Sequence, residues 1–269
     1  MEGNILFLSF VILCMKTVIL CGGKGTRMKE ETEYRPKPLV EIGGRPILWH
    51  IMKIYAHYGF NEFVVALGYK GDMIKNYFLN SRAHAGDFTI NTNQNTIELH
   101  HTHKDNFVIT FVDTGLESMT GERIKRISPH IKDEEFMLTY GDGVADIDIS
   151  RLVNFHRAQG TIGTITGAKP HSKYGFLQID GNRNLVTDFH EKPLIQDNYV
   201  NSGFMVFNRR MFDYLDNEML ETNTLPRLAR DHALSMYAHN GFWKAMDTYK
   251  EMGDLNRLWE TERPWKVWD

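Results

Sequence analysis

The stretch MKTVILCGGKGTR, residues 15–27, joins a short apolar run to a glycine-rich loop. Val18 to Cys21 is rich in β-branched residues and stops at Gly22 and Gly23, which is the pattern of a buried strand that enters a loop. Three further patterns follow, alternately helix, strand and helix, at residues 46–59, 62–69 and 71–80. This βαβα order predicts a Rossmann-like α/β fold, an open, mainly parallel sheet with helices on both faces.

The rest of the chain predicts continuation of this sheet with small antiparallel additions. Strand patterns between residues 87 and 113 indicate a local hairpin rather than another crossover. From Gly175 onward we expect antiparallel pairing, with Gly181-Asn182 at a hairpin turn. Helix and strand patterns continue through the remaining segments, at residues 121–131, 134–143, 149–159, 161–168, 199–208, 209–216, 225–232, 235–248 and 249–260. No repeat or linker interrupts them, so we expect residues 15–269 to form one domain.

Composition narrows the class of protein. The chain has 269 residues, 42% hydrophobic and 24% charged, with a net charge of -3, which gives no indication of a nucleic acid or membrane partner. Its two cysteines argue against a disulfide framework and predict a reducing compartment, the cytoplasm. Residues 1–14 lack the cation and cleavage site of a signal peptide, and we expect them to be an N-terminal extension.

The glycine loop matches neither of two familiar phosphate-binding motifs. A P-loop needs GxxxxGK followed by serine or threonine, and a dinucleotide fingerprint needs GxGxxG; the spacing of Gly22, Gly23 and Gly25 fails both. Free backbone N–H groups here could still approach phosphates or a base, with a hydroxyl from Thr26 and a guanidinium from Arg27. A plain turn explains the loop equally well on this pattern alone.

A lysine between two prolines favours phosphate binding. Pro36 and Pro38 restrict the backbone around Lys37, so its charge is presented from a stiff segment shortly after the glycine loop.

Two aspartates follow apolar strands. Asp142 lies where the strand of residues 134–140 ends, and ligands of open α/β sheets bind at the carboxyl ends of strands. A carboxylate with few other protein ligands suits Mg²⁺, which keeps waters and shares phosphate oxygens. Asp247 could supply a second carboxylate.

A third group suits a sugar phosphate. Glu191 offers a carboxylate for sugar hydroxyls, Lys192 offers an ammonium for a phosphate, and Asn201 follows closely. Surface charge is the alternative interpretation of both charged residues.

Together these segments resemble the sugar-1-phosphate nucleotidylyltransferases. The family motifs appear in order at Leu20 to Met28, Arg35 to Pro38, Gly141-Asp142, Glu191 to Pro193, Asn201 to Gly203 and Asp247. The resemblance spans residue 15 to the C-terminus, and the segments around residues 41–55, 112–126, 140–148 and 241–268 are similar to the subgroup that uses CTP and glucose 1-phosphate. Cys21 departs from the usual alanine, and Ser202 from glycine or alanine; both are small.

The resemblance implies a fold of the nucleotide-diphospho-sugar transferase type and a role for each motif. It implies that Lys37, Arg27 and Asp142 are catalytic, and that Asp142 and Asp247 hold Mg²⁺. Glu191, Lys192 and Asn201 would bind the sugar phosphate. The implied nucleotide-binding residues are Leu20, Gly22, Gly23, Gly25, Thr26, Arg27, Lys37, Arg123 and Tyr140.

Alternatives remain at this stage. Transfer of a uridylyl or thymidylyl group, or a non-catalytic regulatory homologue that binds sugar nucleotides, would share most of these motifs. A metal-dependent glycosyltransferase would share the sheet and the aspartate at a strand end, but not the glycine loop and the Pro-Lys-Pro segment. The aromatic C-terminus, with Trp259, Trp265 and Trp268, predicts packing on the domain or on a neighbouring subunit, and we expect a homo-oligomer.

Overall fold

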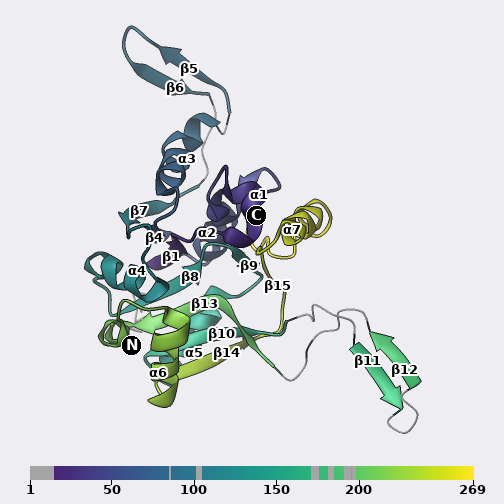
Figure 1. Cartoon of the computed structure of the whole chain (residues 1–269). Helices are drawn as coiled ribbons and strands as arrows, with labels where there is room; N and C mark the ends of the chain where they lie inside the picture. The colour runs from purple at the N-terminus through teal and green to yellow at the C-terminus, as the bar shows by residue number, and fades with distance from the viewer. Residues whose placement is uncertain are drawn as a thin grey trace, which may run out of the picture.

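The structure, a computed structural model, describes residues 15–84, 86–100, 105–170, 176–180, 185–190, 195 and 198–269 (Figure 1). Seven strands form the central sheet in the order β14-β10-β13-β8-β1-β4-β7. Their bounds, in chain order, are β1 Thr17–Cys21, β4 Glu62–Leu67, β7 Val108–Asp113, β8 Glu135–Tyr140, β10 Gly163–Ala168, β13 Val200–Asn208 and β14 Leu234–His239. Strand β13 is antiparallel to both of its neighbours and the other pairs are parallel, so the prediction of a mainly parallel sheet is confirmed.

The central strands are buried on both faces, as their continuous apolar sequence predicts. In β1, Ile19 and Cys21 face one hydrophobic cluster, while Val18 and Leu20 face another on the opposite side of the sheet. Helices cover both faces (Figure 1). The first cluster includes side chains of α2 Ile47–His57, α3 Gly71–His84, α5 Ile149–Gln159 and α7 Tyr249–Thr261. The second includes side chains of α4 Thr120–Ile127 and α6 Leu225–Arg230.

Two expectations about strand direction were wrong. Strand β7 does not belong to a local hairpin; it pairs in parallel with β4 at the edge of the central sheet, and α3 lies in the crossover. Its partly buried Ile109 and Phe111 pack against the first cluster, which gives the strand its place in the sheet. Strand β14, expected to pair in the antiparallel sense, is likewise parallel to β10. The helix α6 lies in the connection between β13 and β14.

Smaller elements surround the sheet. Two antiparallel hairpins, β5 Phe88–Asn91 with β6 Thr96–Leu99 and β11 Phe176–Asp180 with β12 Leu185–His190, project away from it (Figure 1). The expected turn at Gly181-Asn182 lies outside the described residues. The short pairs are β2 Glu41–Ile42 with β3 Arg45–Pro46 and β9 Gly143–Ala145 with β15 Trp243–Ala245. Among the described residues, no helix is both long and apolar enough to cross a membrane.

Short helical turns complete the chain. They are the small α-helix α1 Lys29–Thr32, the 3₁₀ turns η1 Thr26–Met28, η2 Lys37–Leu39, η3 Ser128–His130 and η4 Arg209–Tyr214, and the π-helix η5 Leu220–Thr224. The segment expected to be a helix at residues 209–216 is therefore a 3₁₀ turn.

The C-terminal tryptophans pack on the domain around a buried histidine. His50 Nε2 lies 2.8 Å from the Ile42 carbonyl oxygen, to which it donates, and Nδ1 accepts from the Trp265 indole N–H at 3.3 Å. Trp259 packs against the same ring in a T-shaped arrangement, and Trp268 packs against it at a tilted angle. The bond from Trp265 requires the neutral imidazole, because a protonated Nδ1 cannot accept, and burial together with the charge of Arg45 lowers the pKa of His50 to about 4.

We therefore expect acid to destabilise the fold through His50. Between pH 6.5 and pH 4 the unfolded chain binds a proton at this residue and the folded chain does not. The free energy of unfolding should thus fall by up to about 1.4 kcal/mol for each unit that the pH is lowered in this window. Urea unfolding of the wild type and of His50→Gln at pH 7, 6 and 5 measures the difference in slope. Parallel slopes for the two proteins would show that His50 does not carry the effect.

Candidate active site

The glycine loop leaves the end of β1 at the carboxyl edge of the sheet. Gly25 has a φ of +63°, in the left-handed region that favours glycine, and it precedes the 3₁₀ turn η1. Thr32 Oγ1 lies 3.1 Å from the Gly25 carbonyl oxygen and fixes the loop to α1. A Cβ at residue 25 would come within 2.7 Å of the Thr32 methyl, so the loop turns here in close contact with the helix.

Arg123 holds this loop in place from beneath. Its side chain is buried, with 4% of its surface exposed, and a Cβ at Gly22 or Gly68 would collide with its guanidinium. The two terminal nitrogens donate to oxygens at 2.6–3.1 Å, those of Gly22, Leu67, Thr114, Gly115 and Leu116. These acceptors lie at the ends of β1, β4 and β7. The nucleotide contact expected of Arg123 stays a prediction; in this structure its guanidinium connects the ends of three strands.

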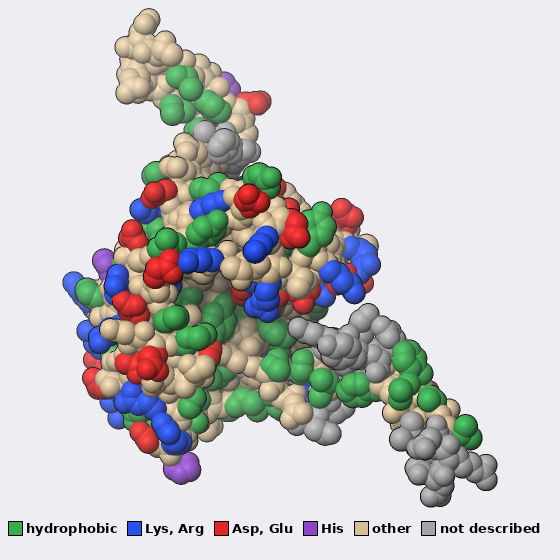
Figure 2. All heavy atoms as spheres, viewed as in Figure 1, with side chains coloured by type: hydrophobic (Ala, Val, Ile, Leu, Met, Phe, Trp, Pro, Cys, Tyr) green, Lys and Arg blue, Asp and Glu red, His purple; other side chains and the backbone are tan. Residues whose placement is uncertain are grey.

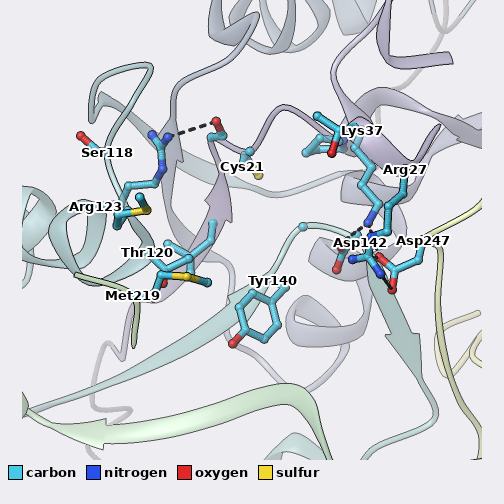
Figure 3. A pocket seen from close by; sticks show the side chains of 18 residues that line it. Cys21, Arg27, Lys37, Ser118, Thr120, Arg123, Tyr140, Asp142, Met219 and Asp247 are labelled. Atoms are coloured by element: carbon cyan, nitrogen blue, oxygen red, sulfur yellow. Dashed lines mark hydrogen bonds and ion pairs between the residues drawn. The ribbon is translucent and has the colours of Figure 1, made fainter. Parts of the chain in front are cut away.

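Lys37 lies between two carboxylates. Its ammonium nitrogen is 2.6 Å from Asp142 Oδ2 and 2.8 Å from Asp247 Oδ1, and Arg27 contacts both oxygens of Asp247 at 2.9 and 3.0 Å (Figure 3). Burial acts to lower the pKa of Lys37, but the charges and hydrogen bonds of both aspartates outweigh it and raise the pKa above its usual value. Lys37 is therefore a cation throughout the physiological range.

The backbone brings the two aspartates together. Asp142 follows β8 directly, and its carbonyl oxygen accepts the Met246 N–H at 2.8 Å beside the β9–β15 pair. Asp247 precedes α7, and its own N–H donates to Glu251 Oε2 at 2.7 Å. Residues 105 positions apart thus meet at one point because two short strands pair.

The carboxylates fit a magnesium ion in chemistry. Oxygens of Asp142 and Asp247 converge on a single cationic nitrogen, so the structure already places a positive charge between them. Hard oxygen donors are the ligands that Mg²⁺ takes in proteins, usually with one or two carboxylates and substrate phosphates completing the shell. Among the described residues no third carboxylate, histidine or cysteine joins the pair, which agrees with a metal completed by substrate.

Two adjoining cavities open at this cluster. The larger has a volume of about 340 Å³, and the smaller about 230 Å³. The larger is lined by every residue expected to bind nucleotide or metal, which are Leu20, Gly22, Gly23, Gly25, Thr26, Arg27, Lys37, Arg123, Tyr140, Asp142 and Asp247. The smaller contains Asn201 and shares Arg27, Tyr140, Asp142 and Asp247 with the first. Glu191 and Lys192 lie outside the described residues.

The larger cavity has the ion-paired cluster at one end and a guanidinium with neutral side chains at the other. Figure 3 shows Lys37, Arg27 and the two aspartates at one end, and Arg123 with Ser118, Thr120 and Met219 at the other. Because the Arg123 guanidinium donates to protein oxygens, its end of the cavity suits a flat, weakly polar group of a ligand whose charged group lies at the first end.

Several lining residues are additional to those that the sequence indicated. They are Cys21, Pro38, Ser118, Met119, Thr120, Gly141 and Met219 in the larger cavity and Gly143, Ser202, Trp243 and Ala245 in the smaller. Most of them lie inside segments that carry the family resemblance. Met219 has no such signal, because it belongs to a segment outside every motif.

Known proteins are similar to this chain in sequence and in fold. A profile described as Nucleotidyl transferase matches residues 16–263. The glucose-1-phosphate cytidylyltransferases of Salmonella typhi and Salmonella typhimurium (strain LT2) are each 45% identical over 259 residues, which cover 95% of this chain and 100% of theirs. HddC from Yersinia pseudotuberculosis has a similar fold, with a TM-score of 0.66 at 21% identity over 91% of this chain and 99% of its own. The chain belongs to the nucleotidyl transferase family.

Proposed function

We propose that this chain transfers the cytidylyl group of CTP to glucose 1-phosphate and releases pyrophosphate. The observation that carries the proposal is the pair of cavities that share Arg27 and the two aspartates, with Lys37 held between those aspartates in the larger cavity. The choice of base and sugar is supported by the two Salmonella cytidylyltransferases, whose full length aligns at 45% identity.

The reaction forms one bond and breaks one. A phosphate oxygen of glucose 1-phosphate attacks the α-phosphorus of CTP, and the bond to the β-phosphate oxygen breaks, so that pyrophosphate leaves with the electron pair. Because the attacking oxygen is already ionised at neutral pH, no general base is required. Catalysis then depends on alignment of two anions and on stabilisation of the charge that develops between them.

The residues of the cluster suit this task. Lys37 lines the larger cavity and contacts the two aspartates that line both, so it would stabilise charge at the α-phosphate, and Arg27 would offset charge on the triphosphate. The glycine loop would place backbone N–H groups beside the nucleotide. Asp142 and Asp247 would hold Mg²⁺, which when bound neutralises phosphate oxygens. Since both aspartates contact Lys37 at 2.6 and 2.8 Å, substrate binding must redistribute these contacts.

The sugar phosphate would occupy the smaller cavity. Asn201 lies there with Trp243, whose indole N–H donates to the Ser202 carbonyl oxygen at 2.9 Å. We extend the sugar-phosphate site to Glu191 and Lys192 on the resemblance alone. The expected homo-oligomer stays a prediction. Exposed apolar side chains on the two projecting hairpins, among them Ile97 and Leu177, support it (Figure 2).

The test is pyrophosphate release with glucose 1-phosphate and each of CTP, UTP, dTTP and ATP, with and without Mg²⁺. We expect CTP with Mg²⁺ to give the highest kcat/KM. Preference for UTP or dTTP would replace the cytidylyl assignment by its nearest alternatives. Absence of release with every triphosphate would favour a regulatory protein that binds sugar nucleotides.

A further inference from the structure

Tyr140 separates the two cavities and is held by a carboxylate outside both. The tyrosine ends β8 and lines the larger and the smaller cavity. Its hydroxyl donates to Glu221 Oε1 at 2.5 Å. Glu221 lies in the π-helix η5, a form that occurs mostly as short segments and frequently at functional sites.

The hydrogens around Glu221 can be assigned. Thr120 Oγ1 accepts the Leu220 N–H at 2.8 Å and lies 2.8 Å from Glu221 Oε2, to which its own hydrogen is directed. A carboxylate only accepts, so Thr120 and Tyr140 both donate to Glu221. Burial, and then the charge of Glu221, raise the pKa of Tyr140, which keeps its phenol protonated and able to donate.

The direction of hydrogen bonding extends to Asn201. Its Oδ1 accepts the Gly203 N–H at 2.9 Å, which assigns Nδ2 to the side that faces Tyr140, 3.5 Å from the hydroxyl oxygen. Gly203 has a φ of +89°, and a Cβ there would lie 2.6 Å from the Tyr140 ring. The ring is thus packed on the backbone that orients Asn201.

Tyr140 and Asn201 thus provide an acceptor and a donor next to each other in the smaller cavity. The single hydrogen of the Tyr140 hydroxyl is taken by Glu221, so its oxygen presents only lone pairs. Asn201 Nδ2 donates one hydrogen to that oxygen at 3.5 Å and presents its second hydrogen to the cavity. A sugar hydroxyl can accept from one and donate to the other, whereas an ionised phosphate oxygen can only accept. This pair therefore suits the hydroxyl side of a sugar phosphate and directs the phosphate away, toward Arg27.

We propose that Glu221 is a positioning residue that selects the sugar by fixing the direction of the Tyr140 hydroxyl. The inference rests on the proposed function, because it assigns the smaller cavity to the sugar phosphate. Glutamine at position 221 has the same size but only one acceptor oxygen. One of the two hydroxyls must then turn. We expect it to be that of Tyr140, because Thr120 Oγ1 is also held by the Leu220 N–H, and the Tyr140 hydrogen is then released toward the cavity.

Steady-state kinetics of Glu221→Gln test the inference. We expect the KM for glucose 1-phosphate to rise roughly tenfold, with kcat and the KM for CTP within about twofold of wild type. Tyr140→Phe should raise the same KM, and the double variant should equal Tyr140→Phe alone, since Glu221 acts through that hydroxyl. Asp231→Asn is the matched control: it makes the same carboxylate-to-amide change at a surface residue that accepts the Tyr214 hydroxyl at 2.9 Å, and it should leave both KM values unchanged.

The outcomes separate the inference from the function on which it rests. If wild type releases no pyrophosphate from CTP and glucose 1-phosphate, the proposed function fails. If wild type is active and Glu221→Gln leaves the KM for glucose 1-phosphate unchanged, or raises both KM values equally, the inference alone is overturned. Additive effects in the double variant would overturn it too. Should Glu221→Gln not fold, Tyr140→Phe carries the same comparison of the two KM values.

Discussion

Replacing Lys37 with alanine is expected to lower kcat about a hundredfold, the usual effect of losing one electrostatic contact to a transition state. The ammonium is the cation held between Asp142 and Asp247, with 12% of its side chain exposed, so no other group can move into its place without rearrangement. Arg27 remains paired with Asp247 after the change and keeps that carboxylate neutralised. The loss should therefore appear in turnover rather than in folding.

Single-turnover and steady-state rates of Lys37→Ala, together with thermal unfolding, measure this. Lys75→Ala is a matched control, because it removes a lysine that pairs with Asp72 at 3.1 Å on the surface of α3. It should keep wild-type rates. Lys37→Arg retains the charge but not the compact ammonium, so it should recover only part of the rate. A kcat for Lys37→Ala within about threefold of wild type would refute the role given to this lysine by the charge argument.

The parts of the site that the sequence could indicate are those with a local chemical signal. Lys37 is marked by its two prolines, and Asp142 by its place after an apolar strand. Such features need no knowledge of distant partners, since they follow from backbone stiffness and from the common edge at which parallel strands end. The parallel sheet was predicted from another local signal, the alternation of strand and helix patterns along the chain.

What the sequence could not indicate depends on which strands lie side by side. The nucleotide contact expected of Arg123 stays a prediction, and its bonds to the ends of three strands could not be indicated, because those strands are adjacent only in the folded sheet. Met219 immediately precedes a π-helix and Glu221 lies in it, and the side chains of a π-helix do not follow the 3.6-residue period used to read helices. Strand β14 was assigned the wrong direction because the sequence of a short strand does not specify which other strand it pairs with.

Replacing Asp142 with asparagine is the second change expected to abolish most activity. Asparagine keeps the shape of the side chain, and the backbone carbonyl that accepts the Met246 N–H is untouched, so the β9–β15 pairing should persist. The variant loses one of two negative charges that converge between the cavities. We expect kcat to fall about a hundredfold and the Mg²⁺ concentration for half-maximal rate to rise about tenfold or more.

A direct measurement of metal binding distinguishes two roles of Asp142, which are to bind the metal ion and to hold Lys37 in position. Mn²⁺ binding in the presence of CTP, followed by electron paramagnetic resonance, should weaken in Asp142→Asn and in Asp247→Asn. It should be unchanged in Asp146→Asn, which alters a carboxylate four residues away that lies 3.0 Å from His239 Nε2 and lines neither cavity. If Asp142→Asn lost its rate but bound Mn²⁺ as wild type does, its role would be to hold Lys37, and its effect would not add to that of Lys37→Ala. Weakened Mn²⁺ binding in both aspartate variants, with Lys37→Ala still able to bind the ion, is the result that the proposed metal site requires.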